Sequence, residues 1–184
     1  QAERSTANMI LKQGLDSGIL IESNKAHVSR AKSTEQWADV CKETENWSLT
    51  VWYGKWRTEE TGDAFFKEQT YTGIAVNTDN NEIVGLYILH PNNVGRCGHI
   101  CNASYTVRRD FRGEHIGEKL VLDCLAQAKE KGFRVMQFNA VVANNTHALH
   151  LYERIGFTRL GVIPQGFRMP DGHYEDIIPH YYVL

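Results

Sequence analysis

The chain has no long hydrophobic run, few cysteines and almost no net charge. No apolar stretch approaches the ~20 residues that a membrane-spanning helix needs, and no secretory signal pattern is present. The formal net charge is −2, so a broad electrostatic affinity for nucleic acid is not indicated. We therefore expect neither a membrane nor a nucleic acid as a partner. We also expect an intracellular, cytoplasmic location, and we leave a mitochondrial location open.

Cysteines are too few and too scattered for a typical metal or redox motif. They are Cys41, Cys97, Cys101 and Cys124, and none has C-x-x-C spacing. Cys97, His99 and Cys101 would share one face if that stretch were a strand, and could then hold a metal. No fourth ligand is in view, so we favour buried thiols in a reducing compartment and predict no metal site.

Length and composition indicate one globular domain spanning residues 1–184. Hydrophobic residues make up 42% and charged residues 23% of the chain, which is ordinary for a globular protein of this size. No repeat, low-complexity segment or linker is present. The chain begins at Gln1 rather than methionine, which leaves open a leader or another N-terminal stretch ahead of it.

The first third of the chain mixes predicted helices with an aromatic segment. Residues 1–18 and 33–44 have helical patterns, and residues 19–22 form a short apolar run that could be the first strand. Residues 47–56 carry three tryptophans and a tyrosine. Such density is typical of a pocket wall or of a core layer, and we favour the core.

Two strand patterns follow, and a turn joins them. Residues 71–77 and 83–90 are rich in β-branched and aromatic residues, and Asp79-Asn80-Asn81 between them is turn chemistry. We therefore predict a β-hairpin, followed by a loop at residues 91–98.

A strand, a charged turn and a helix come next. Residues 102–107 alternate with the period of a strand, and residues 108–112 form the turn. From Gly113 the apolar residues recur at helical spacing, until Gly132 ends the helix. The recurring apolar residues are Ile116, Leu120, Val121, Cys124, Leu125 and Ala128, and the residues assigned to the polar side are Glu118, Lys119, Asp123, Gln127, Lys129 and Glu130.

This strand–turn–helix favours an anion. Backbone N–H groups at the helix start and the helix dipole both attract negative charge. Arg112 adds a positive charge, while Gly113 and Gly117 let a phosphate approach the backbone. The pattern fits a pyrophosphate cradle and equally an ordinary basic surface turn.

The segments after the helix complete a crossover unit and then close the sheet. Residues 134–142 read as a buried strand parallel to the one before the helix. Asn144 or Asn145 then caps a second helix that ends at Gly156. Its predicted apolar face is Ala148, Leu151, Tyr152 and Ile155. Residues 158–163 and 173–184 look like strands of a closing hairpin, separated by a loop at 164–172.

Two blocks of sequence resemble the GCN5-related N-acetyltransferases (GNAT). They are RGEHIG at residues 112–117, and Asn145, Ala148 and LYERIGF at residues 151–157, at the family's usual separation. Within residues 91–164, the blocks PNNVGRCGHICNA, RG-x-x-IG and FNAVVANN resemble in particular the proline-analogue (azetidine-2-carboxylate) N-acetyltransferases of yeast. The resemblance implies an α/β GNAT fold. That fold is a mixed, mostly antiparallel sheet of six to seven strands, with a central parallel β-α-β unit and flanking helices.

The resemblance also implies acetyl-CoA as co-substrate and gives residues to hold it. The backbone of Tyr105, Thr106 and Val107 would pair with pantetheine, and Asn145 would contact CoA, cap its helix, or do both. The pyrophosphate would rest on the cradle residues Arg112, Gly113, Glu114, His115, Ile116 and Gly117. The family usually has glycine where this chain has His115, and the amides can still bind phosphate there if His115 keeps ordinary helical angles.

For catalysis, the resemblance implies direct attack of an amine on the acetyl group. Tyr152 matches the general acid, although it could instead be a core tyrosine on an apolar helix face. Asn102 and Asn139 match residues that contact an amino-acid substrate, and Asn102 would orient the acceptor amine or bind a carboxylate; the alternative is a pair of structural amides. We expect a small amino-acid-like acceptor, with proline analogues among the candidates, and leave a homodimer open. The rival hypothesis is a non-catalytic acyl-CoA-binding sensor or interaction domain.

Overall fold

The computed structural model describes residues 19–20, 26–30 and 68–184, and the chain divides into two compact units. The first unit holds the described residues up to His90 together with Ser104–Lys131, and the second holds Pro91–Ala103 and Gly132–Leu184. The predicted helices at 1–18 and 33–44 and the aromatic segment at 47–56 lie outside the described residues. A single domain over residues 1–184 stays a prediction.

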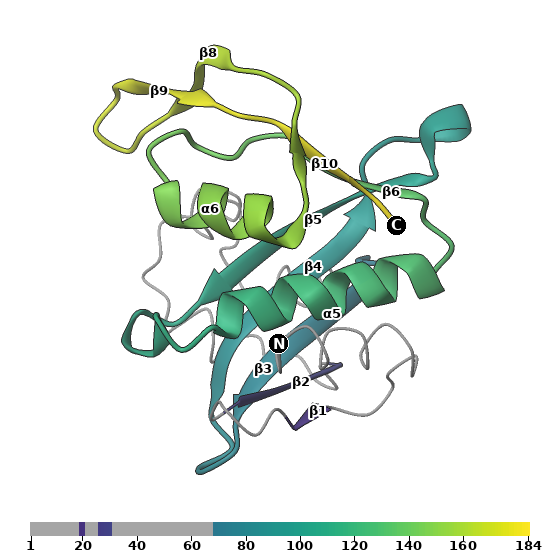
Figure 1. Ribbon diagram of the computed structural model, residues 1–184, viewed down its shortest axis with the longest axis vertical. Helices are drawn as coiled ribbons and strands as arrows, with labels where there is room; N and C mark the ends of the chain where they lie inside the picture. The colour runs from purple at the N-terminus through teal and green to yellow at the C-terminus, as the bar shows by residue number, and fades with distance from the viewer. Residues whose placement is uncertain (1–18, 21–25, 31–67) are drawn as a thin grey trace. The chain divides into compact units, whose positions relative to one another are not determined.

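Antiparallel strands form the sheet of the first unit. They are β1 (Ile19–Leu20), β2 (Ala26–Arg30), β3 (Tyr71–Asn77) and β4 (Ile83–Pro91), in that order, followed by β5 (Ile100–Val107). The predicted hairpin at 71–90 is confirmed, because β3 and β4 pair from Tyr71↔Leu89 to Val76↔Ile83 (Figure 1). Every residue of β3 is buried, so both faces of this strand are covered.

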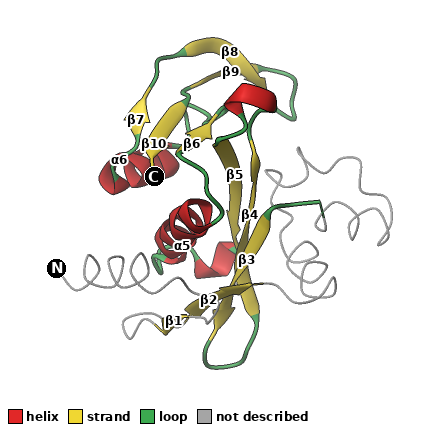
Figure 2. Ribbon diagram, turned by 90° about the vertical axis from the view of Figure 1, so that its right-hand side faces the viewer, coloured by secondary structure: helices red, strands yellow, loops and turns green. Residues whose placement is uncertain are grey.

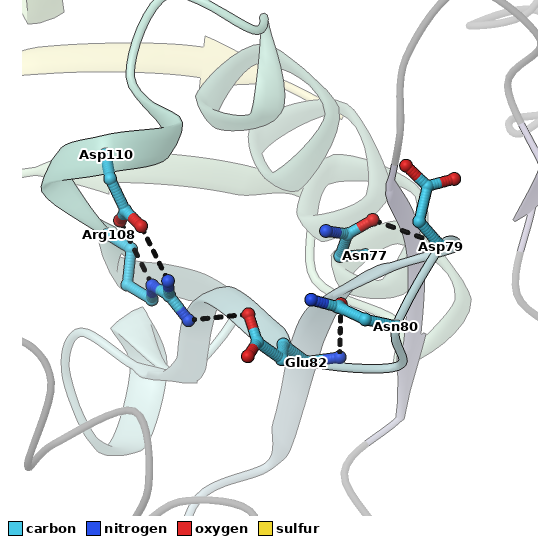
Figure 3. A network of polar contacts seen from close by, with 6 residues as sticks. All are labelled: Asn77, Asp79, Asn80, Glu82, Arg108 and Asp110. Carbon is cyan, nitrogen blue, oxygen red and sulfur yellow. Dashed lines mark hydrogen bonds and ion pairs between the residues drawn. The ribbon is translucent and has the colours of Figure 1, made fainter.

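Side-chain amides shape the turn between β3 and β4, as the sequence predicts. The Asn77 Oδ1 atom accepts a hydrogen bond from the Asp79 N–H at 3.0 Å, and the Asn80 Oδ1 atom accepts one from the Glu82 N–H at 3.0 Å (Figure 3). Asn81 has a φ of 60°, in the left-handed region that asparagine tolerates better than most residues.

The helix α5 (Ile116–Glu130) covers one face of β3 and β4 (Figure 2). All six predicted apolar positions of this helix are buried. The helix packs closely where β4 has a glycine: a Cβ atom on Gly85 would lie 3.1 Å from the Leu120 Cδ1 atom. As predicted, the helix ends just before Gly132, which has a φ of 86°.

The polar side of α5 differs from the prediction. Lys119, Asp123 and Gln127, one helical turn apart, are buried. The sheet supplies a partner, because the Tyr87 hydroxyl on β4 donates a hydrogen bond to the Asp123 carboxylate. Burial raises the pKa of Asp123 to about 6, although the hydrogen bond from Tyr87 opposes this shift. The helix therefore carries a buried polar stripe that its amphipathic pattern does not reveal.

In the second unit, the sheet order runs from β5 through β6 (Val135–Phe138) and β10 (His180–Val183) to β7 (Thr158–Arg159). β5 and β6 pair in parallel, which confirms the predicted crossover, and β10 is antiparallel to both β6 and β7. The predicted α/β class, with mostly antiparallel pairing around one parallel pair, is confirmed.

The helix α6 (Thr146–Ile155) follows the prediction at both ends. Asn145 is its N-cap, and Gly156 ends it with a φ of 111°. The predicted face is only partly right, because Leu149 is the buried residue of this helix, while the four predicted residues are half-buried. Helix α6 therefore presents a wider apolar face than four positions suggest.

Three boundaries in the second unit correct the prediction. β6 ends at Phe138 rather than at residue 142, and β7 covers only Thr158–Arg159. The predicted loop at 164–172 instead contributes most of β8 (Ile163–Arg168), which pairs antiparallel with β9 (Tyr174–Ile177). In the part of the chain that the structure describes, no helix is long and apolar enough to cross a membrane.

Candidate functional site

The turn between β5 and α5 begins at Arg108, whose side chain is held by two carboxylates. The Arg108 guanidinium donates to both carboxylate oxygens of Asp110, at 3.1 Å and 2.6 Å, and to the Glu82 carboxylate at 3.2 Å (Figure 3). These carboxylates, Asp110 above all, raise the pKa of Arg108. The Arg108 N–H also donates to the Val84 carbonyl at 2.8 Å. The turn is therefore tied to the β3–β4 hairpin through both the backbone and the side chain.

The phosphate cradle (residues 112–117) follows this turn and has two left-handed residues. Gly113 has a φ of 88°, and His115, the N-cap of α5, has a φ of 56° and a ψ of 15°. The condition that His115 keeps ordinary helical angles is therefore not met. The position instead has the left-handed geometry that glycine adopts easily and that histidine tolerates at a cost.

The donors present in the cradle fit a diphosphate. The helical ladder of α5 begins with the Lys119 N–H donating to the His115 carbonyl at 3.2 Å, so the amides of Ile116 and Gly117 precede it. Arg112, Gly113, Glu114 and His115 are exposed. A Cβ atom on Gly113 would meet no atom within 4 Å, so the turn is open to an approaching group. The cradle thus combines helix-start amides with a cationic side chain and open space.

The last residues of β5 lead directly into this turn. Thr106 is buried, whereas Tyr105 and Val107 are half-buried. The Tyr105 ring packs against Tyr87, with 5.9 Å between the ring centroids. These three residues and the cradle lie on one continuous segment of the first unit.

In the second unit, the parallel strands separate early. β5 and β6 pair at Ile100↔Val135 and Cys101↔Met136, and the described pairing stops there, although both strands continue. Asn102 is the first residue beyond this point on β5. Its side chain is buried, and its Oδ1 atom accepts a hydrogen bond from the Ala103 N–H at 2.8 Å.

Asn139 lies just past the end of β6 and is exposed, so it is not within a strand as predicted. Its side chain belongs to an amide cluster, formed by Asn92, Gln137 and Asn139. Asn139 Nδ2 donates to Asn92 Oδ1 at 2.7 Å, and Asn139 Oδ1 accepts from Gln137 Nε2 at 3.0 Å and from Asn92 Nδ2 at 3.4 Å. The chain leaves the sheet here and passes to β9, where the Ala143 N–H donates to the Asp176 carbonyl at 2.9 Å.

Tyr152 is half-buried on α6, among other rings of the second unit. Its ring centroid lies 4.6 Å from that of Phe138, 5.5 Å from that of Phe157 and 5.9 Å from that of His180. His180 is completely buried, and its Nδ1 atom lies 2.7 Å from the Ile178 carbonyl oxygen. Burial lowers the pKa of His180, so a neutral imidazole that donates from Nδ1 lies beside Tyr152.

Asn145 caps α6, one of the roles that the sequence allows it. Its Oδ1 atom accepts a hydrogen bond from the Ala148 N–H at 3.2 Å. The cap occupies the carbonyl oxygen, while the side-chain NH2 is the part of the amide that could reach a ligand.

The segment that could have held a metal does not form one strand. Cys97 is exposed in the short 3-10 helix η1 (Gly95–Cys97), His99 is in the following loop, and Cys101 is buried in β5. Burial raises the pKa of Cys101 to about 12, which keeps it a neutral thiol. Within the described residues, no three His, Cys, Asp or Glu side chains are grouped so as to hold a metal ion.

The structure groups some predicted site residues and separates others. Asn102 and Asn139 belong to neighbouring strand segments of the second unit, but the described hydrogen bonds of Asn139 go to Asn92 and Gln137. Sequence reasoning missed Asn92, Gln137 and His180. The repeated amide residues Asn92, Gln137 and Asn139 were a weak signal for the cluster, whereas nothing in the sequence marks His180.

Comparisons with known proteins agree with this geometry. The profile of the Acetyltransferase (GNAT) family matches residues 39–157. N-acetyltransferase aca1 from Schizosaccharomyces pombe is 31% identical in an alignment of 144 residues that covers 70% of this chain and 69% of that protein.

Solved structures share the fold. A GCN5-related N-acetyltransferase from Kribbella flavida is 27% identical, with a TM-score of 0.73 over 87% of this chain and 98% of that one. The structure of yncA from Salmonella typhimurium, which contains its cofactor acetyl-CoA, is 16% identical, with a TM-score of 0.76 over 88% and 95% of the two chains. The chain therefore belongs to the GNAT family of acetyltransferases, the acetyl-CoA-dependent class that the two sequence blocks predict.

Proposed function

We propose that this acetyltransferase transfers the acetyl group of acetyl-CoA to the amine of a small amino-acid-like acceptor, with proline analogues among the candidates. The observation that carries the proposal is the amide cluster at the end of β6. Amide side chains donate to a carboxylate and accept from an amine, which suits an acceptor that has both groups.

The cradle would bind the diphosphate of the co-substrate. The amides of Gly113 to Gly117 would donate to its oxygens, and Arg112 would add a fixed positive charge. Tyr105, Thr106 and Val107 would offer backbone groups to pantetheine, and the side-chain NH2 of Asn145 would add a contact. The support for these roles is the open, left-handed turn at the start of α5.

Tyr152 would act as the general acid. Acetyl-CoA supplies an acetyl thioester, whose thiolate leaves when the acceptor amine attacks directly. The phenol of Tyr152 would donate its proton to that sulfur, because a phenol is protonated at neutral pH. The proton released by the amine would pass to water. The aromatic neighbours of Tyr152 support this role, since they fix its ring and leave the hydroxyl as the polar end.

Replacement of Tyr152 by phenylalanine tests the general acid. We expect turnover to fall about 100-fold or more, since general acid catalysis typically contributes at least about 100-fold, with little change in acetyl-CoA affinity. Thiol release measures turnover and calorimetry measures affinity. Tyr174→Phe, at an exposed tyrosine of the same unit, is the matched control. Unchanged turnover in Tyr152→Phe would remove Tyr152 from the mechanism.

Asn102 would orient the acceptor amine, since an amide cannot act as a base near neutral pH. Its place at the point where β5 and β6 part supports this role. Asn102→Ala should raise the KM for the acceptor much more than the KM for acetyl-CoA. Because Asn102 is buried, thermal unfolding must first show that the variant is folded. Equal effects on both constants would indicate a merely structural amide.

An acceptor panel tests the substrate class. Proline analogues and other free amino acids should release thiol faster than polyamines or peptides with a free N-terminus. Faster reaction with a polyamine or a peptide would overturn the proposed class. Tight acetyl-CoA binding without acceptor-dependent thiol release would instead support the non-catalytic sensor.

A cytoplasmic location is also part of the proposal. It rests on Cys97, Cys101 and Cys124, the described cysteines, which are present as thiols. Fractionation of cells that express the chain would test it, and recovery in an oxidising compartment would contradict it.

A further inference from the structure

The Arg108 side chain is held by three neighbours in the first unit. Its guanidinium makes a two-point contact with the Asp110 carboxylate, at 3.1 Å and 2.6 Å, and donates to the Glu82 carboxylate at 3.2 Å. The guanidinium carbon also lies 4.9 Å from the centre of the Phe111 ring, within the range of a cation–π contact. The side chain is only 14% exposed. An isolated surface ion pair contributes little, but a planar two-point contact within a network of charges fixes the geometry of its partners.

Glu82 presents its carboxylate from a turn that is hydrogen-bonded on both sides. The Glu82 N–H donates to the Asn80 Oδ1 atom at 3.0 Å, and the Glu82 carbonyl accepts from the Asn77 N–H at 2.8 Å (Figure 3). Asn77 is the last residue of β3 and is buried. The contact with Glu82 therefore fixes Arg108 relative to the β3–β4 hairpin.

The short 3-10 helix η2 (Arg109–Phe111) connects this fixed arginine to the phosphate cradle. Arg108 is the N-cap of η2, and its carbonyl accepts from the Phe111 N–H at 3.1 Å. The Arg112 N–H, at the first position of the cradle, donates to the Arg109 carbonyl at 3.3 Å. Because two residues of η2 also contact the guanidinium, the Arg108 side chain determines where the cradle begins.

The same contacts argue against Arg108 as a ligand of the diphosphate. Its Nε, Nη1 and Nη2 atoms each donate to a carboxylate. Together with Glu82 and Asp110, the arginine forms a group with a net negative charge, which would repel an approaching phosphate. Arg108 can therefore assist diphosphate binding through the shape of the turn, and not through direct contact.

We infer that Arg108 is a positioning residue for the co-substrate: its guanidinium, held by Asp110 and Glu82, keeps the phosphate cradle in the geometry that binds the diphosphate of acetyl-CoA. This inference rests on the proposed role of the cradle and adds a residue that touches no substrate. The cradle offers several N–H donors at once, and hydrogen bonds weaken steeply when their angles change. A small displacement of the turn therefore weakens several of these bonds together.

Asp110→Asn tests the inference by the direction of its effect. If Asp110 acted only through its charge, its removal near an anion site would lower the Kd for acetyl-CoA. Loss of the two-point contact should instead release η2, so we expect calorimetry to show a Kd that is about tenfold higher. This is the lower end of what one hydrogen bond to a charged group contributes. An unchanged or lower Kd would overturn the inference.

Arg108→Met and Arg109→Met separate the position of the arginine from its charge. The two residues are neighbours and each variant removes one positive charge, but Arg109 is exposed. Arg108→Met should raise the Kd for acetyl-CoA about tenfold, whereas Arg109→Met should raise it about threefold or less, because an exposed charge is screened by salt. Thermal unfolding checks that each variant is folded at the temperature of calorimetry. Asp110 is exposed, so Asp110→Asn decides the matter if Arg108→Met does not fold. Equal Kd values for the two methionine variants would contradict the positioning role.

Backbone NMR shows whether the cradle itself changes. Without any ligand, the amide resonances of Gly113 and Gly117 should shift in Asp110→Asn and shift much less in Arg109→Met. Equal shifts in the two variants would mean that the contact between Arg108 and Asp110 does not shape the cradle.

Arg112→Met separates this inference from the proposed function. If Arg112→Met leaves the Kd for acetyl-CoA unchanged, the proposed role of the cradle fails, and the inference fails with it. If Arg112→Met weakens binding but Asp110→Asn does not, the cradle stands and the positioning role of Arg108 is wrong. None of these measurements requires an acceptor, so they remain decisive even if the proposed acceptor class is wrong.

Discussion

Substitutions at His115 test whether the cradle depends on a left-handed residue. His115 has a φ of 56°, a conformation that costs an L-residue about 1–2 kcal/mol. Glycine avoids this cost but loses about 0.5–1 kcal/mol more backbone entropy on folding. The net expectation for His115→Gly is thus a gain of between zero and about 1.5 kcal/mol in the free energy of unfolding. His115→Val should lose about 1–3 kcal/mol, because a β-branched residue fits the left-handed region poorly.

Thermal unfolding and calorimetry with acetyl-CoA measure the two consequences. For a chain of this length, 1 kcal/mol corresponds to about 2–4 °C in Tm. His115→Gly should bind acetyl-CoA at least as tightly as the parent. In His115→Val, the turn must change shape to relieve the strain, so the affinity should fall. The control is Lys129→Val, a valine at an exposed position of α5. Equal acetyl-CoA affinity in His115→Val and His115→Gly would refute the link between this backbone conformation and diphosphate binding.

Three further substitutions test the packing. Burial raises the pKa of Asp123 to about 6, so the folded protein favours the protonated carboxyl. The contribution of this group to the free energy of unfolding is therefore complete below about pH 4 and is lost as the pH rises through 6. Asp123→Asn should therefore remove this pH dependence and add up to about 3 kcal/mol at pH 7 in urea unfolding, whereas an unchanged pH profile would contradict the shift. Gly73→Ala should lower the Tm by a destabilisation of about 1–3 kcal/mol, because its Cβ would lie 2.1 Å from the Tyr87 Cε1 atom. Asn145→Ala should cost about 1 kcal/mol in urea unfolding, through loss of the bond to the Ala148 N–H, and no loss would mean that the cap is dispensable.

Periodicity and turn chemistry predicted the elements whose signals are local. The β3–β4 hairpin, the buried face of α5 and both ends of α6 depend on residues close together in the chain, and the prediction holds there. The buried polar stripe of α5 escaped it, because Asp123 is satisfied by Tyr87, which lies 36 positions away. No pattern within a helix can reveal a partner that the sheet supplies.

The same contrast between local signals and partners far apart in the chain applies to the candidate site. The cradle residues form one short segment, so a motif could locate them, although not the left-handed angles of His115. The amide cluster joins Asn92 to Asn139 across 47 positions, and its existence depends on how β4 and β6 end. The segment at 164–172 misled the prediction because Pro164 and Gly166 suggest a loop, whereas pairing with β9 makes most of it a strand.

The contacts of Arg108 limit how the turn before α5 can vary in length. Its side chain joins Glu82 at the end of the hairpin turn to Asp110 in the short helix η2 (Arg109–Phe111). Inserting even one residue between Arg108 and Asp110 would move the Asp110 carboxylate away from the guanidinium. Engineered variants of this turn should therefore keep the spacing of Arg108 and Asp110 as well as their side chains.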